Sequence, residues 1–299
     1  MLSIAFFSVG VGLLGLAVWV VMRQGDSLSQ AAAAAREASA WLVALCVVLP
    51  LVNWLATSAV LWVLMGRYGT VRPREMAALI GAAWLLNLLP LRPGMLGRVA
   101  YHKEFNGIRV RDSVRALFDA LACTGCALAL LVAGVAVGAR LHGVVGITLF
   151  GAGPLVLLGA GAAALRRHGD AWRWPAAIGF RYIDMVTWAV RYMVVFAIIG
   201  QPIGLIGSGG VTVVSQVAML VPVQLGLREW AVGMASTVLP GMNLPTPATA
   251  GGVVEAATPA LIADGMMRAA ELLVVTPLGI GASVWLMRRL RSAKRAPTA

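Results

Sequence analysis

Two breaks marked by proline and glycine interrupt otherwise apolar sequence, at Asn87–Gly94 and Pro222–Glu229. Hydrocarbon offers no water to backbone amides and carbonyls, so irregular backbone at membrane depth must be buried in protein or line a cavity. The two breaks also occupy corresponding places in the two halves of the chain. Such pairs of interrupted apolar segments are typical of inverted repeats that hold a site between them. We therefore expect two re-entrant helical hairpins that meet around a shared site.

The composition is that of a chain in lipid. Of 299 residues, 60% are hydrophobic and 12% are charged, and the mean hydropathy is +0.86. Soluble domains average about 25% charged residues, and several apolar runs here approach the roughly 20 residues that span hydrocarbon. The first run, 4–22, follows no basic segment and is longer than the apolar region of a signal peptide, so we expect a retained helix. The sequence predicts an integral membrane protein.

The predicted fold is an all-α polytopic membrane protein with about six full transmembrane helices and two re-entrant helical hairpins in an inverted repeat. We expect a single membrane domain over 1–299, with 1–140 as the first repeat and 141–299 as the second. The alternative is that both hairpins cross the membrane completely. The predicted full spans are 4–22, 41–66, 114–138, 143–165, 182–200 and 266–287, and the predicted hairpins lie around 76–91 and 207–239.

The distribution of positive charge predicts the topology. The net charge is +12, and four groups beside the apolar runs hold 18 of the 24 basic residues. Short cytoplasmic loops carry the excess of Lys and Arg, so all four groups belong on one side, which requires 76–113 to enter and leave by the same face. Both termini are then cytoplasmic, in a bacterial cytoplasmic (inner) membrane. The groups are Arg67, Arg72 and Arg74; Arg92, Arg98, Lys103, Arg109, Arg111 and Arg115; Arg166, Arg167, Arg173 and Arg181; and Arg288, Arg289, Arg291, Lys294 and Arg295.

The first break combines helix-ending residues with positive charge. Asn87 and two prolines disfavour continued helix, and Gly94 permits close approach of the backbone. Arg92 and Arg98 lie in the same short stretch, and guanidinium groups are forked donors that suit phosphate oxygens. Exposed helix N-termini also attract anions. We predict that these residues bind a lipid phosphate; the alternative is that the arginines only anchor the topology at the interface.

The second break places the adjacent charges of Arg228 and Glu229 after a turn at Gly226. Intramembrane charge is costly and usually faces a partner or a wet cavity. In the last span, Arg268 and Glu271 share one helical face with Asp264. We predict that the break and this last helix complete the substrate site. The alternatives are a helix cap with an interfacial arginine at the break and a self-neutralising structural network in the last helix.

Two further pairs of charges lie within apolar spans. Arg115 and Asp119 are four residues apart, and Asp184 and Arg191 are two helical turns apart. Facing inward, these side chains would line a polar path through the bundle. Facing each other, they would only pin the helices.

Metal, cofactor and enzyme chemistry find no support in the residue pattern. His102, His142 and His168 are scattered without metal-ligand spacing, and Cys123 and Cys126, although spaced like a redox motif, sit in mid-span as small packing residues. A membrane-embedded lipid hydrolase would need a nucleophile with a base, or a metal cluster. We therefore expect neither an enzyme nor a bound metal or cofactor. Because the basic residues cluster beside spans, nucleic-acid binding is not expected either.

The stretch from Asn87 to Arg98, followed by Gly107-Ile108 and the Arg115–Asp119 helix, resembles the flippase-like transmembrane domain of lysylphosphatidylglycerol synthases. Stand-alone relatives of that domain carry a similar N-x-x-P-x-x-x-G-E-x-x-R stretch. Leu220–Glu229 is similar to the family's second motif, with its Gly-Leu/Val-Arg-Glu core, and Arg268 matches a downstream arginine.

This resemblance covers nearly the whole chain. It implies an inverted-repeat fold with two re-entrant hairpins that moves a phospholipid or a polyprenyl-phosphate lipid between leaflets. Met95 stands where the family has an acidic residue, which weakens the case for a charge pair in the first hairpin. The soluble aminoacyl-transferring domain of the synthases has no counterpart here, so lipid aminoacylation is not expected.

We therefore predict a flippase-like membrane lipid translocase that moves an anionic phospholipid or a polyprenyl-phosphate-type lipid between leaflets. Its partners would be membrane lipids with anionic head groups, while a homo-oligomer and a partner lipid-modifying enzyme stay open. No ATP-binding P-loop pattern occurs, so a gradient, the membrane potential or downhill exchange would supply any energy. The alternative function is a non-transporting membrane scaffold for a lipid- or glycan-modifying complex.

Overall fold

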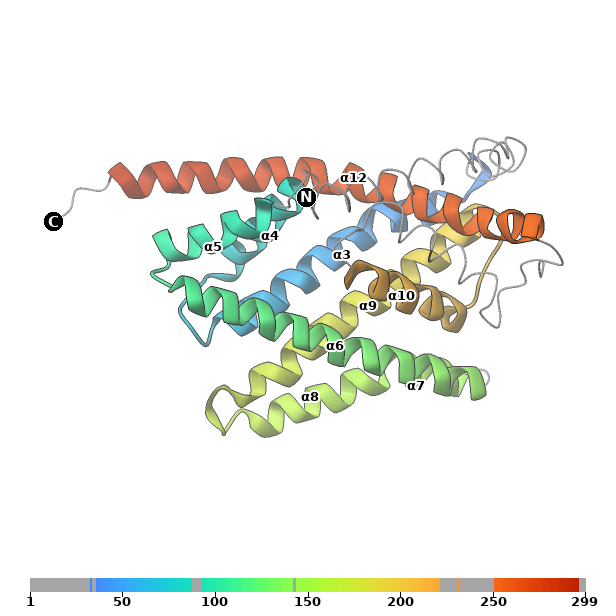
Figure 1. The fold of residues 1–299 in the computed structure, drawn as a ribbon, viewed down its shortest axis with the longest axis horizontal. Coiled ribbons are helices and arrows are strands. Elements are labelled where there is room, and N and C mark those ends of the chain that lie inside the picture. Colours follow the sequence, from blue (N-terminus) through green and yellow to red (C-terminus); the bar gives the residue numbers. More distant parts are fainter. Residues whose placement is uncertain are drawn as a thin grey trace. The chain divides into compact units, whose positions relative to one another are not determined.

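Every regular element in the described part of the chain is a helix, which confirms the predicted all-α class. The computed structural model describes residues 33, 36–87, 93–141, 144–220, 231 and 250–295. The predicted span 4–22 and four predicted site residues (Arg92, Gly226, Arg228 and Glu229) lie outside these ranges. The helices labelled in Figure 1 are α3 (Ala40–Met65), α4 (Pro73–Leu86), α5 (Pro93–Phe105), α6 (Val110–Arg140), α7 (Val144–Gly151), α8 (Gly153–Leu165), α9 (Arg173–Ile198), α10 (Leu205–Leu220) and α12 (Ala250–Arg295), and a 3-10 turn, η1 (Gly169–Trp172), precedes α9.

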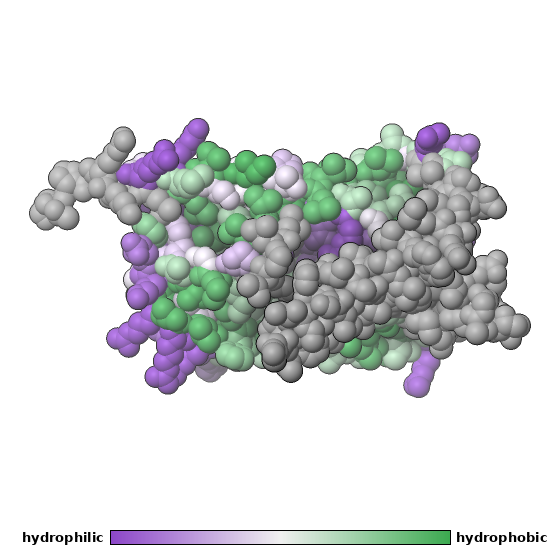
Figure 2. All heavy atoms as spheres, turned by 45° about the horizontal axis from the view of Figure 1, so that its top comes forward, coloured by the Kyte–Doolittle hydropathy of each residue, from purple (hydrophilic) through white to green (hydrophobic). Residues whose placement is uncertain are grey.

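Four described segments are long and apolar enough to cross a membrane: Ala40–Met65, Val110–Arg140, Val144–Leu165 and Pro259–Arg289. Only 11–28% of the apolar window in each is buried inside the protein. Figure 2 shows the outward-facing remainder as broad hydrophobic areas, with hydrophilic side chains gathered densely at one margin. Apolar surface of this extent is stable in lipid and not in water. The chain is a multi-pass membrane protein.

The predicted count of six full spans plus two hairpins is wrong for the described residues. The predicted spans 41–66, 114–138, 143–165 and 266–287 correspond to the four apolar segments. The predicted span 182–200 lies in α9, which is not among them and carries Arg181, Asp184 and Arg191. Of the second predicted hairpin, α10 covers only the first part. The physical reason is that the charged residues within α9 interrupt its apolar sequence. The partners of these charges are described below.

α4 and α5 are two short helices that fold back on each other. α4 begins at Pro73, whose missing N–H and fixed φ suit the first helical position, and its C-cap is Asn87. α5 begins at Pro93 for the same reason. Near the turn, Gly94 packs directly against the backbone of Ala83. At 14 and 13 residues, each helix is shorter than the roughly 20 residues that a span requires.

The helices divide into two compact units, and the division falls within α3, α6, α8, α9 and α12. The first unit comprises Met1–Leu49, Leu128–Gly153 and Met185–Ala270; the second comprises Pro50–Ala127, Pro154–Asp184 and Glu271–Ala299. Each unit has a hydrophobic core of its own, around Tyr192 and Phe196 in the first and around Leu64, Met76 and Ile80 in the second. The described members of all four basic groups belong to the second unit.

Candidate functional site

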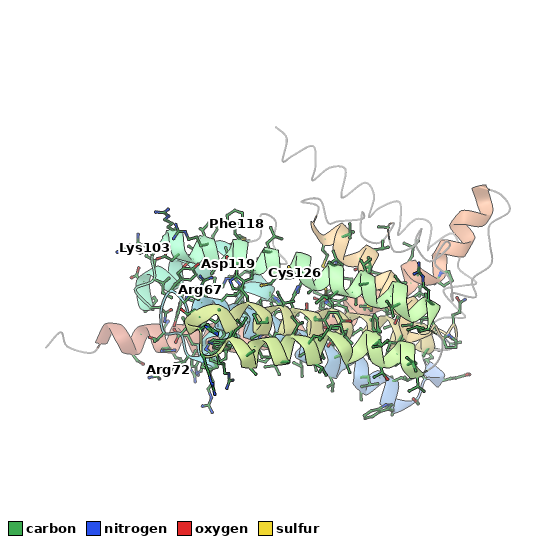
Figure 3. The ribbon with its side chains drawn as sticks, turned by 90° about the horizontal axis from the view of Figure 1, so that it is seen from below. Arg67, Arg72, Lys103, Phe118, Asp119 and Cys126 are labelled. Carbon is green, nitrogen blue, oxygen red and sulfur yellow. The ribbon has the colours of Figure 1, made fainter. Side chains whose placement is uncertain are left out.

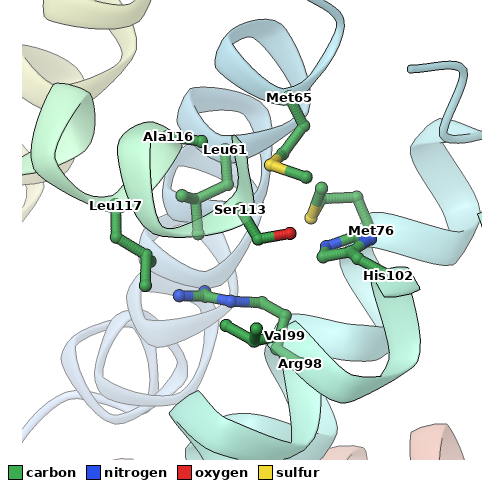
Figure 4. A pocket seen from close by; sticks show the side chains of 9 residues that line it. All are labelled: Leu61, Met65, Met76, Arg98, Val99, His102, Ser113, Ala116 and Leu117. Carbon is green, nitrogen blue, oxygen red and sulfur yellow. The ribbon is translucent and has the colours of Figure 1, made fainter. Parts of the chain in front are cut away.

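A small cavity in the second unit lies between α3, α4, α5 and α6, and Arg98 reaches into it from α5 (Figure 4). Its volume is about 10 Å³, near the smallest volume that holds one water-sized oxygen. Apart from Arg98, His102 and Ser113, its lining is apolar. We call it the Arg98 cavity, and its lining residues are Leu61, Met65, Met76, Arg98, Val99, His102, Ser113, Ala116 and Leu117.

Three polar groups of this lining have no hydrogen-bond partner within the described part of the chain. His102 and Ser113 are 2% and 3% exposed, and the His102 Nε2 and the Ser113 Oγ are both unpaired. Arg98 forms no ion pair or hydrogen bond with any described residue. Burial lowers the pKa of Arg98 to about 10, so the guanidinium remains cationic at neutral pH. Since buried polar groups are nearly always hydrogen-bonded, the two unpaired atoms of His102 and Ser113, beside the half-buried Arg98, indicate a site for a polar ligand.

The local sequence explains why Arg98, His102 and Ser113 line the same cavity. Arg98 and His102 are four residues apart and therefore share one face of α5. α5 then ends in a turn at Gly107, whose φ of +65° suits glycine, and the Ile108 amide donates to the His102 carbonyl at 3.0 Å. This turn lets α6 begin at Val110, so that Ser113 in its first turns faces back toward α5. In Figure 4 the Ser113 hydroxyl points toward the His102 ring, and the guanidinium extends past it toward α6.

A buried carboxylate holds the hairpin in place. Glu75, 2% exposed at the start of α4, forms an ion pair with Arg289 of α12 at 2.7 Å and accepts a hydrogen bond from Asn106 Nδ2 at 3.1 Å. Burial alone would raise the pKa of this carboxyl, but hydrogen bonds from Asn106, Tyr101 and Arg289 outweigh it and lower the pKa. Glu75 is therefore an ionised anchor that joins α4, the end of α5 and α12.

The same network orients the imidazole of His102. Its Nδ1 lies 3.1 Å from the Asn106 Oδ1, so the ring is held by the residue that also contacts Glu75. Burial lowers the pKa of His102, and the charge of Arg98 lowers it further, while Asn106 and Glu75 act in the opposite direction. The ring is therefore neutral at pH 7, and its Nε2 faces the cavity.

The other described residues of the first break have different surroundings. Asn87 is exposed and caps α4, so it lies outside the cavity lining. Gly94 serves helix packing, since a Cβ at this position would lie 2.7 Å from the Ala83 Cα and overlap its carbonyl oxygen. Thus the structure places Arg98 in the cavity and gives Gly94 a packing role.

Arg115 and Asp119, predicted to line a polar path or to pin the helices, each contact a different partner. Arg115 lies 3.8 Å from Asp112, whereas Asp119 lies 3.6 Å from Arg67 and accepts a hydrogen bond from the Tyr68 hydroxyl at 3.3 Å. Figure 3 shows Arg67 and Asp119 beside each other. Because the loop after α3 brings a closer cation to Asp119, these charges join α3 to α6 and do not line the cavity.

Asp184 is also occupied by local partners. It is 1% exposed, forms an ion pair with Arg181, and its Oδ1 accepts a hydrogen bond from Asn53 Nδ2 at 2.7 Å. These contacts lie within the second unit and tie α9 to α3. The structure therefore supports a helix-pinning role for Asp184.

Arg191 and the charged residues of α12 contact partners outside the Arg98 cavity. In the first unit, Arg191 lies over the Trp188 ring at 4.2 Å and donates to the Met267 carbonyl at 3.3 Å, and the Tyr192 hydroxyl donates to Asp264 Oδ1 at 2.9 Å. These contacts pin α9 to α12. Arg268 and Glu271 are half-buried, and each has a polar or electrostatic partner.

His102, Ser113, Glu75 and Asn106 were not predicted as site residues. A weak signal existed for His102, because it follows Arg98 by one helical turn. The remaining residues come from three separate elements, and only the fold back of α5 onto α4 brings them together.

No protein family, no curated protein and no solved structure matches this chain in the three comparisons made. No metal-binding cluster of three or more His, Cys, Asp or Glu side chains occurs among the described residues. The chemistry of the site therefore has to be argued from its own geometry.

Proposed function

We propose that this protein is a membrane lipid translocase that moves a lipid with an anionic, phosphate-bearing head group between leaflets. The observation that carries the proposal is Arg98, a cation held among apolar side chains, without a carboxylate partner among the described residues. Such a cation is costly unless an anion neutralises it. A phosphate oxygen fits both the size of the Arg98 cavity and the donors of the guanidinium.

A lipid is favoured over a soluble anion because of the surroundings. The four apolar segments leave most of their side chains facing outward, so acyl chains stay in hydrocarbon while only the head group needs protein contacts. In the proposal, α4 and α5 form a re-entrant hairpin from the cytoplasmic side, and Arg98 of this hairpin binds the head group.

The test is a leaflet assay in proteoliposomes that contain fluorescent phosphatidylglycerol, in which an impermeant quencher reports outward movement. Arg98→Gln removes the charge and keeps a polar, though shorter, side chain. We expect lipid movement to slow about ten- to a hundredfold, the loss expected for a hydrogen bond to a charged group. Arg72→Gln is the matched control, because Arg72 is exposed in the loop before α4 and should leave the rate unchanged.

Equal rates for the two variants would refute the role of Arg98. If the folded wild-type protein moves no lipid faster than protein-free liposomes, the translocase proposal is wrong, and the scaffold alternative is favoured. Thermal unfolding in detergent checks that Arg98→Gln is folded.

A further inference from the structure

We propose that the Arg98 cavity binds a phosphate-type oxyanion together with one proton, and that His102 carries this proton. The identification of the anion as a lipid head group rests on the proposed function. The proton linkage rests on the geometry of α4, α5 and α6 alone.

The hydrogen-bond chain behind His102 determines its tautomer. Asn106 donates through its Nδ2 to the ionised Glu75, so its Oδ1 is the atom that faces the imidazole. An amide oxygen only accepts hydrogen bonds. The His102 Nδ1 must therefore carry a hydrogen, and in the neutral ring the Nε2 presents a lone pair to the cavity.

A lone pair at this position is the wrong partner for an anion. Oxyanion oxygens only accept hydrogen bonds, so a phosphate oxygen beside Arg98 and Ser113 would face the lone pair of a neutral His102. When a proton from water bonds to the Nε2 lone pair, the ring becomes a donor at both nitrogens. The phosphate then receives hydrogen bonds from the Ser113 hydroxyl and from His102 Nε2, and the Arg98 guanidinium on the other side of Ser113 neutralises its charge (Figure 4).

The surrounding charges make protonation depend on the anion. On α5 itself Arg98 opposes a second positive charge, and from α4 only Glu75, acting through Asn106, favours it. α3 contributes Leu61 and Met65 to the lining, and α6 contributes Ser113 with two apolar neighbours, so neither adds a charge. An anion bound to Arg98 removes the opposing charge and lets the ring protonate.

The sign of the pH dependence follows directly. The pKa of His102 is lowered in the free site, so at neutral pH a proton has to be taken up as the anion binds. Affinity must then increase as pH falls, by up to about tenfold per pH unit between the free and the bound pKa of His102. Below the free pKa and above the bound pKa, affinity becomes independent of pH.

The experiment measures binding to the full-length protein in detergent by calorimetry between about pH 5 and pH 8, the range in which histidines titrate. The probes are dihexanoyl-phosphatidylglycerol and dimethyl phosphate, phosphodiesters whose single charge does not change over this range. Dihexanoylglycerol, which lacks the phosphate, is the uncharged control. Binding of dihexanoyl-phosphatidylglycerol alone identifies a lipid head group, and equal binding of dimethyl phosphate identifies a free phosphodiester.

We expect wild-type affinity to increase toward low pH, with uptake approaching one proton per phosphodiester when buffers of different ionisation enthalpy are compared. In His102→Gln the affinity should be flat with pH. Ser113→Ala should weaken binding about three- to tenfold at every pH, as for one lost neutral hydrogen bond, and keep the slope. His168→Gln is the matched control, because His168 is exposed; this variant should keep the wild-type slope and affinity.

A slope that persists in His102→Gln, or Arg98-dependent binding without proton uptake in the wild type, overturns the inference and leaves the proposed function standing. If the wild-type protein binds the probes no more tightly than Arg98→Gln does, both the inference and the proposed function are overturned. Nitrogen-15 histidine spectra of the wild-type protein give an independent measurement, since the chain has only 3 histidines. Saturating phosphatidylglycerol probe should convert one ring from the neutral to the protonated form, and an unchanged spectrum would contradict the assignment.

Discussion

Glu75 is the residue on which the position of the hairpin depends. Its carboxylate is almost fully buried, yet it contacts Arg289 from α12 and Asn106 from the end of α5. Removing one partner from a buried polar network leaves the others unsatisfied, which costs more than the interaction itself contributes. Through Asn106, the same carboxylate also determines which nitrogen of His102 faces the Arg98 cavity.

We predict that Glu75→Gln lowers the free energy of unfolding by about 1–3 kcal/mol, measured by thermal unfolding in detergent near pH 7. The pKa of Glu75 is lowered in the folded protein, so its contribution is complete above the unfolded value of 4.5 and is lost as pH falls through the lower folded value. The difference between wild type and variant should therefore close on acidification.

Asp112→Asn is the matched control for this prediction, because it removes a carboxylate from the more exposed 3.8 Å pair with Arg115. Exposed pairs contribute about 0–1 kcal/mol, so the variant should unfold close to the wild-type temperature. An equal decrease in the free energy of unfolding in both variants would show that Glu75 contributes no more to stability than the exposed Asp112.

At the scale of elements, the α4–α5 hairpin depends on a close helix contact. Gly94 allows the backbone of α5 to touch that of α4 at Ala83, near the turn, where no side chain can move aside. The opposite end is held by the Glu75 network. The hairpin is thereby fixed at both ends, which keeps Arg98 and His102 in place between them.

We predict that Gly94→Ala separates α4 from α5 and destabilises the protein by about 1–3 kcal/mol, as overpacking does. Gly97→Ala is the control on the same helix, because its Cβ would meet nothing within 4 Å. Alanine is the better helix former by about 0.5–1 kcal/mol, so this variant should be neutral or slightly more stable. The comparison uses thermal unfolding together with the leaflet assay, and similar unfolding temperatures for the two variants would contradict the packing argument.

At the scale of the whole molecule, positive charge is concentrated in one of the two compact units. The loops after α3, after α5 and after α8 and the end of α12 all belong to the second unit and carry the described members of the basic groups. The loop between α9 and α10 belongs to the first unit and holds no lysine or arginine over residues 199–204. By the rule of cytoplasmic positive charge, we expect these loops of the second unit to be cytoplasmic.

The topology can be tested with single cysteines in a background that lacks Cys46, Cys123 and Cys126. We predict that a membrane-impermeant maleimide labels Arg109→Cys and Arg167→Cys only from the cytoplasmic side, and Leu141→Cys, in the exposed loop between α6 and α7, only from the outside. Intact cells and inside-out vesicles supply the two orientations. Labelling of Arg167→Cys and Leu141→Cys from the same side would show that Val144–Leu165 does not cross the membrane.

The sequence by itself predicted the features that depend on composition and local order: the membrane environment, the all-helical class, the positions of the four apolar segments and the end of a helix near Asn87. It also singled out Arg98, which lines the cavity, while its role in binding stays a prediction. It overcounted the spans, because apolar length alone does not reveal that Arg181, Asp184 and Arg191 in α9 meet their partners inside the protein. It left the partners of Arg115 and Asp119 open, since helical spacing cannot reveal that Arg67 contacts Asp119.

Only the tertiary structure decided what Arg98 faces. The cavity requires α5 to lie against α4 with its turn at Gly107 directing α6 back, and it requires Glu75 to orient Asn106 and thereby His102. Each of these contacts joins residues from different helices, and their free energies depend on packing and desolvation in the folded chain. Helical spacing and hydropathy describe one element at a time, so they locate a charge along the chain but not the partners that surround it.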